Sequence, residues 1–321
     1  MTTVKEPGKR LIPDRKDLLE RNFSLDLVAA RPMPDAVLMC PPEYFDVVDI
    51  KNVFMKDGLS KVDRDLAARQ WQSLKEALEN IGVPVKTLPA AAGLEDMVFA
   101  ANQALVGISR EGEPYIVPGI MRHTSRQNEV PHYIDWFRSK GYRVLSLPDD
   151  LTSNSKDKIY FEGHGDAIWH PEKLLLWGGY GHRTTYSAYN HLIDIIEVPI
   201  LLLELTDSTF YHLDTAFCPL DHQTVLYYPG AFSKDGIELI ETVFESTIAV
   251  SREDAFNFAC NAIVSGNNVF LERGSVATCE ALLDYGFNIV EVETSEFRKS
   301  GGSVFCMTLD IYKDQSSPGT K

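Results

Sequence analysis

The sequence predicts an α/β protein that is built from a series of small, similar units. Short apolar runs of strand length alternate with single amphipathic helices along the chain. Several of these runs end in Pro-Gly or Gly-Gly pairs, which favour turns. A weak repeat of small α/β units closed into a ring fits this rhythm. A doubly wound sheet is the competing architecture, but no glycine-rich phosphate loop opens an expected helix.

The first half of the chain opens with a charged segment and then alternates between strands and helices. Residues 1–33 contain many charges and three prolines, so we expect an arm or peripheral segment. A helix over 61–81 is predicted because Leu66, Trp71 and Leu74 lie on one broad apolar face. The other elements expected here are the strands 36–40, 85–88, 103–108, 115–117 and 143–147, the helix 132–140, and a polar lid over 152–158.

The second half repeats the same alternation up to the end of the chain. Helical spacing of apolar residues predicts helices over 187–196, 234–244 and 275–285. The expected strands are 174–177, 200–205, 224–228, 247–250, 268–272, 289–293 and 307–312. No change in composition marks a domain boundary, so we expect one domain over 34–313 and a flexible tail over 314–321.

Charge and cysteine usage restrict the possible partners and the compartment. The formal net charge of −15 disfavours a nucleic-acid partner and suits a small cationic one. The five cysteines are scattered without disulfide or zinc spacing, and the histidines show no compact metal-binding spacing, so we expect a reducing compartment and no metal. The N-terminus lacks the apolar centre of a signal peptide, and the longest apolar run, 198–205, is too short to cross a membrane. These features favour a cytoplasmic protein.

Four polar patches lie around or at the ends of expected strands, at residues 96–102, 161–166, 210–215 and 299–306, and in the first of them Asp96 and Asn102 bracket a short apolar strand. In the last patch Cys306 follows Gly301-Gly302, a pair that permits close backbone approach. Alone, such a cysteine is more often a small buried apolar residue than a nucleophile. His212 and Asp214 are two residues apart, so on an extended segment both would point to the same side. Aiming several such groups into one pocket carries a desolvation cost, which favours a functional site.

Together the four patches resemble the signatures of the guanidine-modifying superfamily. That superfamily has a five-bladed α/β propeller fold, called the pentein fold, and includes arginine deiminase, dimethylarginine dimethylaminohydrolase and the amidinotransferases. Its Asp-x-x-Phe, Glu-Gly-x-Asp, His-x-Asp and Gly-Gly-x-x-x-Cys motifs read here as 96–99, 162–166, 212–214 and 301–306. Further stretches resemble the arginine dihydrolase branch, which converts arginine to ornithine, carbon dioxide and ammonia. They are 39–46, 211–215, 226–232 and 257–261.

The resemblance implies a role for each site residue, with arginine as the substrate and no cofactor. Cys306 would be the nucleophile, His212 the general acid and base, and Glu162 the carboxylate that orients His212. Three aspartates, Asp96, Asp166 and Asp214, would bind the guanidinium group of the substrate. Arg126 and Arg183 would bind the substrate carboxylate, and Asn52 would be a further pocket residue.

Asn102 is an informative departure, because deiminases usually carry an aspartate there. An amide can both donate and accept hydrogen bonds, so we expect Asn102 to retain a neutral ureido group and to permit a second attack by Cys306. His164 and His182 also depart from the family pattern, and they could narrow the pocket or adapt it to another guanidino compound.

Several alternatives remain open at this point. The protein could instead release citrulline from arginine or a methylated arginine, transfer the amidine to another amine, or act as a non-catalytic binding protein of the same fold. The combination of Cys306, His212 and Glu162 weighs against the last of these, because a binding protein does not need it. A homo-oligomer is possible.

Overall fold

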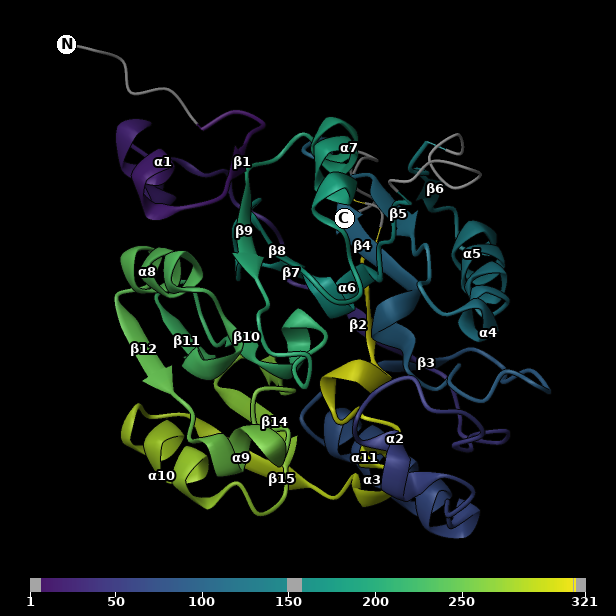
Figure 1. The fold of residues 1–321 in the computed structure, drawn as a ribbon. Helices are drawn as coiled ribbons and strands as arrows, with labels where there is room; N and C mark the ends of the chain where they lie inside the picture. The colour runs from purple at the N-terminus through teal and green to yellow at the C-terminus, as the bar shows by residue number, and fades with distance from the viewer. Residues whose placement is uncertain (1–6, 149–157, 314, 316–321) are drawn as a thin grey trace.

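The structure is a computed structural model that describes residues 7–148, 158–313 and 315 (Figure 1). It is a mixed α/β fold with five small sheets among the described residues. One is the four-stranded sheet β1-β9-β8-β7, formed by Leu11–Ile12, Ile200–Glu204, Leu176–Tyr180 and Ala167–Trp169. Its strands β7 and β8 are antiparallel, and β8 and β9 are parallel.

The other four sheets have three strands each and repeat this pattern of one antiparallel and one parallel pair. They are β16-β2-β3 (Leu309–Ile311, Ala36–Met39, Val85–Thr87) and β4-β5-β6 (Ala104–Ile108, Pro114–Pro118, Arg143–Val144). The remaining two are β10-β11-β12 (Phe217–Pro219, Thr224–Tyr227, Ser246–Ala249) and β13-β14-β15 (Ile263–Ser265, Asn268–Glu272, Asn288–Val292). In the first of the four, the last strand of the described chain pairs with a strand from its beginning.

In each of the five sheets one parallel pair is joined through a crossover helix, because parallel strands cannot be linked by a tight turn. The additional parallel pair, β1 with β9, is formed by the N-terminal segment. The crossover helices are α3 (Arg64–Asn80), α5 (Val130–Ser139), α7 (Tyr186–Ile196), α8 (Lys234–Val243) and α10 (Val276–Asp284). Helix α3 begins where Asp63 caps the backbone N–H of Leu66, and it buries Trp71 and Leu74. The strands and helices predicted by residue range are found in the expected order, with ends that differ by a few residues, but the short strands β1, β7, β10 and β13 were not predicted.

Shorter elements connect these units and carry much of the polar sequence. The short α-helices are α1 (Arg15–Glu20), α2 (Met55–Gly58), α4 (Thr124–Gln127), α6 (Gly163–Asp166), α9 (Arg252–Phe256) and α11 (Ser295–Arg298). The 3₁₀ turns are η1 (Leu25–Leu27), η2 (Ala100–Gln103), η4 (Leu213–Thr215), η5 (Pro229–Ala231) and η6 (Phe305–Met307). Three of these turns, η2, η4 and η6, lie within the polar patches.

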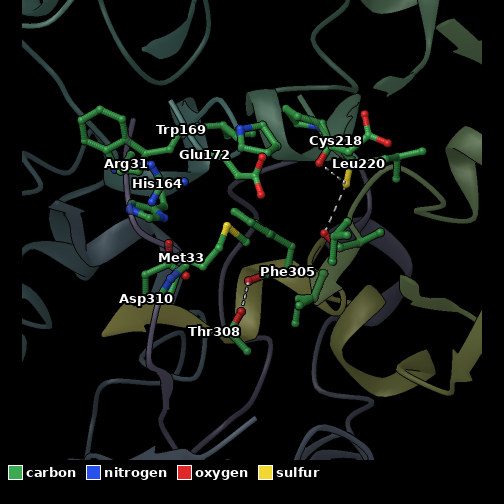
Figure 2. A pocket seen from close by; sticks show the side chains of 18 of the residues that line it. Arg31, Met33, His164, Trp169, Glu172, Cys218, Leu220, Phe305, Thr308 and Asp310 are labelled. Carbon is green, nitrogen blue, oxygen red and sulfur yellow. Dashed lines mark hydrogen bonds between the residues drawn. The ribbon is translucent and has the colours of Figure 1, made fainter. Parts of the chain in front are cut away.

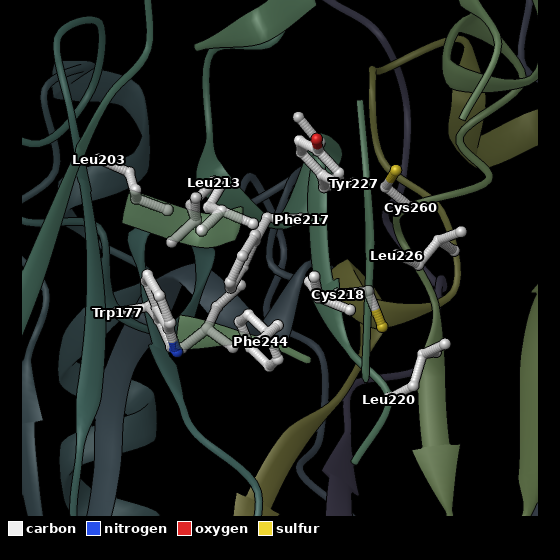
Figure 3. Packing of buried hydrophobic residues seen from close by; sticks show 14 of the residues in the cluster. Trp177, Leu203, Leu213, Phe217, Cys218, Leu220, Leu226, Tyr227, Phe244 and Cys260 are labelled. Carbon is white, nitrogen blue, oxygen red and sulfur yellow. The ribbon is translucent and has the colours of Figure 1, made fainter. Parts of the chain in front are cut away.

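The core consists of clusters in which residues from neighbouring sheets meet. In Figure 3, Trp177 of β8 lies against Phe217 of β10 and Phe244 at the end of α8. The Trp177 and Phe244 rings stack with their centroids 5.3 Å apart. Burial of a large apolar side chain contributes roughly 1.5–3 kcal/mol, so such contacts fix one sheet against the next. The N-terminal segment joins this cluster through Ile12 and Leu18 and adds β1 to the edge of the first sheet.

The structure corrects three details of the expected local structure. The patch at 96–102 was expected to bracket a strand, but it ends in the 3₁₀ turn η2. His212 is extended, whereas Asp214 lies in η4, so the two do not share one straight strand. The strand expected over 307–312 begins only at Leu309, because residues 305–307 form η6.

Two expectations concern the rest of the chain. Most of the lid expected over 152–158 and nearly all of the tail expected over 314–321 lie outside the described residues. In the part of the chain that is described, no helix has both the length and the apolar character needed to cross a membrane.

Candidate active site

Glycines allow the turns that carry the polar patches to approach one another. Gly165 of α6 faces Asn102 of η2, and a Cβ atom on Gly165 would lie 2.3 Å from the Asn102 Nδ2 atom. Gly163 has a φ of +53°, and its Cβ would lie 2.6 Å from the carbonyl of Ala104. Any larger residue at these two positions would push α6 away from η2. The sequence Glu-Gly-His-Gly-Asp therefore packs Glu162 and the 96–102 patch into one site.

His212 and Glu162 form a buried pair. The His212 Nε2 and Glu162 Oε2 atoms are 2.7 Å apart, and Arg183 donates a hydrogen bond to the same oxygen at 3.1 Å. Burial lowers the pKa of His212 to about 4, even though Glu162 acts in the opposite direction. Burial would raise the pKa of Glu162, but Arg183 and His212 outweigh it and hold that pKa well below its usual range. The pair at neutral pH is therefore a neutral imidazole and an ionised carboxylate.

Cys306 lies in η6 and contacts Asp214 and Asn261. Its Sγ atom is 3.1 Å from Asp214 Oδ2, and Asn261 Nδ2 donates to the same sulfur at 3.1 Å. Burial and the neighbouring Asp214 raise the pKa of the thiol well above its usual value. Burial also raises the pKa of Asp214 to about 7. The resting site thus holds a protonated thiol, and a cation that entered beside it would favour the thiolate.

Asn102 is held in one orientation by Arg126. The Asn102 Oδ1 atom accepts a hydrogen bond from Arg126 Nη1 at 2.9 Å, while its Nδ2 atom lies 3.5 Å from His212 Nδ1. The other two nitrogens of Arg126 donate to the buried Glu129, at 3.1 Å and 3.0 Å. All three nitrogens of this guanidinium are engaged within the protein. These contacts favour a supporting role for Arg126 rather than the predicted grip on a substrate carboxylate.

Asp96 and Asn52 are both bonded to Ser300, which precedes the Gly-Gly turn. Asp96 Oδ1 accepts a hydrogen bond from Ser300 at 2.9 Å, and its Oδ2 atom forms an ion pair with Lys51 Nζ at 3.0 Å. Asn52 donates to the Ser300 carbonyl at 2.9 Å and so ties its own segment to the Gly-Gly turn. Asp96 therefore already has partners within the protein.

Asp166 lies behind the site instead of facing the cavity. Its Oδ1 atom accepts the backbone N–H of Leu213 at 3.0 Å, and it is not among the described residues that line the cavity. Burial raises its pKa well above the usual range for an aspartate. This contact fixes the turn that carries His212 and Asp214, which suits a positioning residue better than a guanidinium ligand.

The cavity between these groups is small and opens toward a wider outer hollow. About 20 Å³ remains in the inner cavity, which is room for about one water molecule. Cys306, His212 and Asn102 line it, together with Lys51, Asn52, Met55, Asp96, Phe99, Arg126, Arg183, Tyr211, Ser300, Gly301 and Gly302. The outer hollow has a volume of about 370 Å³ and shares Lys51, Asn52, Arg183 and Tyr211 with the inner cavity.

The two unusual histidines lie in different places. His182 lines the outer hollow, so it can influence what enters. His164 lines a separate cavity of about 400 Å³, where Figure 2 shows it beside Arg31 and across from Cys218. Its Nε2 atom lies 3.1 Å from the Val106 carbonyl. His164 is therefore not positioned to narrow the inner cavity.

Three residues of the site were not predicted from the sequence. Asn261 makes two hydrogen bonds to Cys306: its Oδ1 atom accepts from the Cys306 backbone N–H, and its Nδ2 atom donates to the Cys306 sulfur. The 257–261 stretch resembles the arginine dihydrolase branch, but that resemblance alone did not identify Asn261 as a site residue. Lys51 and Arg122 belong to no recognisable motif, and lysines and arginines are common at protein surfaces. Only the fold shows that both residues line the outer hollow.

Comparisons with known proteins identify similar chains over most of this length. The model of the family described as N,N dimethylarginine dimethylhydrolase, eukaryotic, matches residues 41–313. The bifunctional arginine dihydrolase/ornithine cyclodeaminase AgrE of Nostoc sp. is 38% identical over 85% of this chain and 37% of its own length. The N(G),N(G)-dimethylarginine dimethylaminohydrolase of Mycobacterium tuberculosis is 35% identical over 85% of both chains.

A solved structure shows the same similarity. The N-terminal domain of ArgZ, a cyanobacterial arginine dihydrolase, has been solved as a mutant bound to substrate. It is 34% identical to this chain, with a TM-score of 0.80, over 87% of this chain and 98% of that domain. This chain thus corresponds to one domain of such bifunctional proteins and spans little more than a third (37%) of the length of AgrE.

Proposed function

Since this chain belongs to the eukaryotic N,N dimethylarginine dimethylhydrolase family, we propose that it is an arginine dihydrolase, which hydrolyses the guanidino group of arginine to give ornithine, carbon dioxide and ammonia. One observation carries the proposal. Cys306 and His212 line one cavity, with the carboxyl of Asp214 3.1 Å from the Cys306 sulfur and the carboxylate of Glu162 2.7 Å from His212. A guanidinium group placed there would have a nucleophile, a counter-charge and a proton donor within reach.

The first half of the reaction follows from these contacts. Asp214 Oδ1 is buried and has no hydrogen-bond partner in the structure, so it can accept an N–H of the guanidinium. The positive charge then lowers the pKa of the Cys306 thiol. The thiol proton passes to the neutral His212, and the thiolate attacks the guanidinium carbon. The departing nitrogen takes a proton from His212, which Glu162 stabilises as an imidazolium, and ammonia leaves behind a covalent thiouronium on Cys306.

The second half returns the enzyme to its starting state. His212 Nε2 donates a hydrogen bond to the ionised Glu162, so the free Nδ1 atom removes a proton from a water molecule, and the resulting hydroxide attacks the thiouronium carbon. The C–S bond then breaks, and the thiolate of Cys306 leaves as the product becomes a ureido group, that of citrulline. In a dihydrolase the same thiolate attacks this ureido carbon and the second ammonia leaves. Water then hydrolyses the resulting thiocarbamate, which frees Cys306, and the carbamate formed loses carbon dioxide to give ornithine.

Asn102 supports the second round. Its Oδ1 atom is engaged by Arg126, so the side chain presents its N–H₂ donor toward His212 and the cavity. A donor suits the carbonyl oxygen of a ureido group, whereas the aspartate of deiminases offers only acceptors. The outer arginines Arg122 and Arg183 are the best placed to bind the substrate carboxylate, because both line the outer hollow.

Broader features of the protein are part of the same proposal. The five sheets repeat one strand pattern, follow one another around a common centre in Figure 1, and include a sheet that joins both ends of the described chain. This arrangement supports a five-bladed propeller, with residues 34–313 as the catalytic domain. All five cysteines are free thiols, which supports a cytoplasmic location.

A second candidate is release of citrulline from a methylated arginine, favoured by the similarity to the mycobacterial dimethylaminohydrolase. One experiment separates the two. The protein is incubated with arginine, dimethylarginine or citrulline, and ornithine, citrulline, ammonia and methylamines are measured, with Cys306→Ser as the control. Ornithine and ammonia without free citrulline supports the dihydrolase. Methylamine and citrulline would favour the second candidate, and turnover by Cys306→Ser would refute the covalent mechanism.

A further inference from the structure

A second cavity lies next to the turn that carries Cys306, and the proposed reaction does not use it. Its volume is about 400 Å³, which is within the range typical of small-molecule sites. Phe305 and Thr308 line this second cavity, whereas Cys306 between them lines the inner cavity of the active site. The described residues that line the second cavity include none that line the inner cavity or the outer hollow. It is therefore a separate site.

Arg31 gives the second cavity a buried positive charge. Only 6% of this residue is exposed, and Figure 2 shows it beside His164 in the cavity wall. Its guanidinium lies 5.5 Å from the centroid of the Trp169 ring. The Nη1 atom donates to the hydroxyl of Tyr312 and, at 3.4 Å, to the carbonyl of Pro32, but the Nε atom is buried without a partner. Among the described residues no carboxylate forms an ion pair with Arg31.

The carboxylates that line the second cavity already have partners. Glu172 and His222 form an ion pair, with 3.7 Å between Oε2 and Nδ1. Asp221 Oδ1 accepts two backbone N–H groups, each at 2.7 Å, and Asp310 Oδ2 accepts a tyrosine hydroxyl at 3.4 Å. The donor that lacks a partner is thus on Arg31. A buried cation without a counter-charge is costly, so an anion that entered the cavity would be stabilised there.

Much of the wall around this charge is apolar. Phe217, Leu220 and Ile263 are buried residues of the wall, and the half-buried ring of Phe305 adds to them. Met33 also lines the cavity and has 47% of its surface exposed, so a ligand can reach the cavity from solvent. Such a wall favours a ligand with an apolar body, because removal of apolar surface from water is favourable.

We propose that the second cavity is a ligand site that binds a small carboxylate with an apolar body. The carboxylate accepts the unpartnered N–H of Arg31 and balances its charge, since a guanidinium matches a carboxylate in both charge and geometry. The apolar body packs against Phe217 and Phe305. A cationic ligand of the same shape would face Arg31 and would find the carboxylates engaged. The proposal is independent of hydrolysis at Cys306.

The test measures the binding of two small probes by calorimetry. They are hydrocinnamate, an apolar carboxylate, and phenethylamine, a cation with a similar apolar body. We expect saturable binding of hydrocinnamate with a Kd of about 0.1–1 mM, and no binding of phenethylamine up to about 10 mM. Arg31→Met should weaken the binding of hydrocinnamate at least about tenfold. The control is Arg122→Met, which removes an exposed arginine of the outer hollow and should leave the Kd unchanged.

A second variant keeps the test decisive if circular dichroism shows that Arg31→Met does not fold. Val264 is a half-buried residue of the cavity wall, so Val264→Trp fills the cavity while Arg31 stays in place. This variant should abolish the binding of hydrocinnamate. The proposal is overturned if hydrocinnamate does not bind the unmodified protein, or if its Kd is unchanged in folded Arg31→Met or in Val264→Trp. Equal binding of phenethylamine would also overturn it, as would weaker binding of hydrocinnamate in Arg122→Met, which would place the probe in the outer hollow.

Discussion

The carboxyl group of Asp214 accepts a hydrogen bond from the Cys306 thiol, with Oδ2 and Sγ 3.1 Å apart. The same carboxyl therefore restrains the nucleophile in the empty site and has a second oxygen free for a guanidinium. Its negative charge disfavours a thiolate until a cation arrives. Substrate binding and activation of the nucleophile are thus coupled through one side chain.

Asp214→Asn should separate thiol reactivity from catalysis. Without the acidic neighbour the pKa of Cys306 falls, so alkylation by iodoacetamide at pH 8 should be faster by several-fold, roughly up to tenfold. Turnover should fall by about 100-fold or more, because the guanidinium loses its counter-charge. The control is Asp166→Asn, which does not touch the sulfur and should leave the alkylation rate unchanged. Slower alkylation in Asp214→Asn would contradict this account.

Asn102→Asp should shift the product from ornithine toward citrulline. The substitution replaces the donor beside His212 by an acceptor, so the neutral ureido group is released before a second attack. The ornithine-to-citrulline ratio is measured after complete consumption of arginine. Asn267→Asp, on an exposed turn, is the matched control and should not change the ratio. An unchanged ratio in Asn102→Asp would show that this residue does not decide how far the reaction goes.

Arg126 and Arg122 should respond differently to replacement by methionine. Arg126→Met leaves the buried Glu129 without its ion-pair partner, which typically costs about 3–5 kcal/mol of stability. Arg122→Met removes an exposed cation of the outer hollow, so it should raise KM by about tenfold while kcat and the melting temperature change little. Chemical denaturation and steady-state kinetics measure the two effects. A large rise in KM without destabilisation in Arg126→Met would restore its predicted role at the substrate carboxylate.

The stability contributed by His212 should depend on pH in a defined direction. Its pKa is about 4 in the folded protein, below the value of about 6.5 of an unfolded chain. The unfolded state therefore binds more protons between these values, and this contribution is lost as the pH falls from about 6.5 to 4. Asp214 has a pKa raised to about 7 in the folded protein, so its contribution to stability increases as the pH falls over a similar range.

The contribution of His212 is isolated by comparison with His212→Gln. As the pH falls from 6.5 to 4, the original protein should lose up to roughly 3 kcal/mol more unfolding free energy than the variant does. Urea denaturation at several pH values measures it. A difference that stays constant across this range would mean that the imidazole is not buried in its neutral form.

Gly165→Ala should impair catalysis more than folding. The added Cβ atom would meet the Nδ2 atom of Asn102 at 2.3 Å, so the amide must move away from His212. Displacement of a positioned group by about 1 Å can reduce the rate by about 100-fold. Gly8→Ala, where nothing lies within 4 Å of the added atom, is the control. Wild-type kcat in Gly165→Ala would show that this close approach is not needed.

Much of the fold could be predicted from the sequence because its longer strands and helices have clear periodicity. The strands β7, β10 and β13 were missed, since three residues are too few to show alternation. The turns η2, η4 and η6 were also missed, because 3₁₀ turns follow from tertiary contacts more than from local sequence. The motifs identified Cys306, His212 and Glu162 as candidates, and the structure brings Glu162 and His212 into contact.

Which charged groups are already engaged could not be read from the sequence. Arg122 and Arg126 are four residues apart, and only the fold shows that the second is bound to Glu129 while the first lines the outer hollow. Asp96 matched a motif position, but its ion pair with Lys51 joins residues 45 positions apart. Such pairings depend on how separate segments meet, so a motif gives residue types without giving their partners.

The pairing of β16 with β2 has a consequence for the newly made chain. Strand β2 is synthesised before its antiparallel neighbour, Leu309–Ile311, and all the other described strands of the four three-stranded sheets are made between the two. Cys306 precedes β16 by only three residues, so its turn cannot be anchored until that strand has docked. Until then β2 keeps an open edge, and the thiol has no fixed place beside Asp214. A chain that has passed residue 306 but has not reached residue 309 therefore carries every predicted site residue but lacks the strand that holds the Cys306 turn in place.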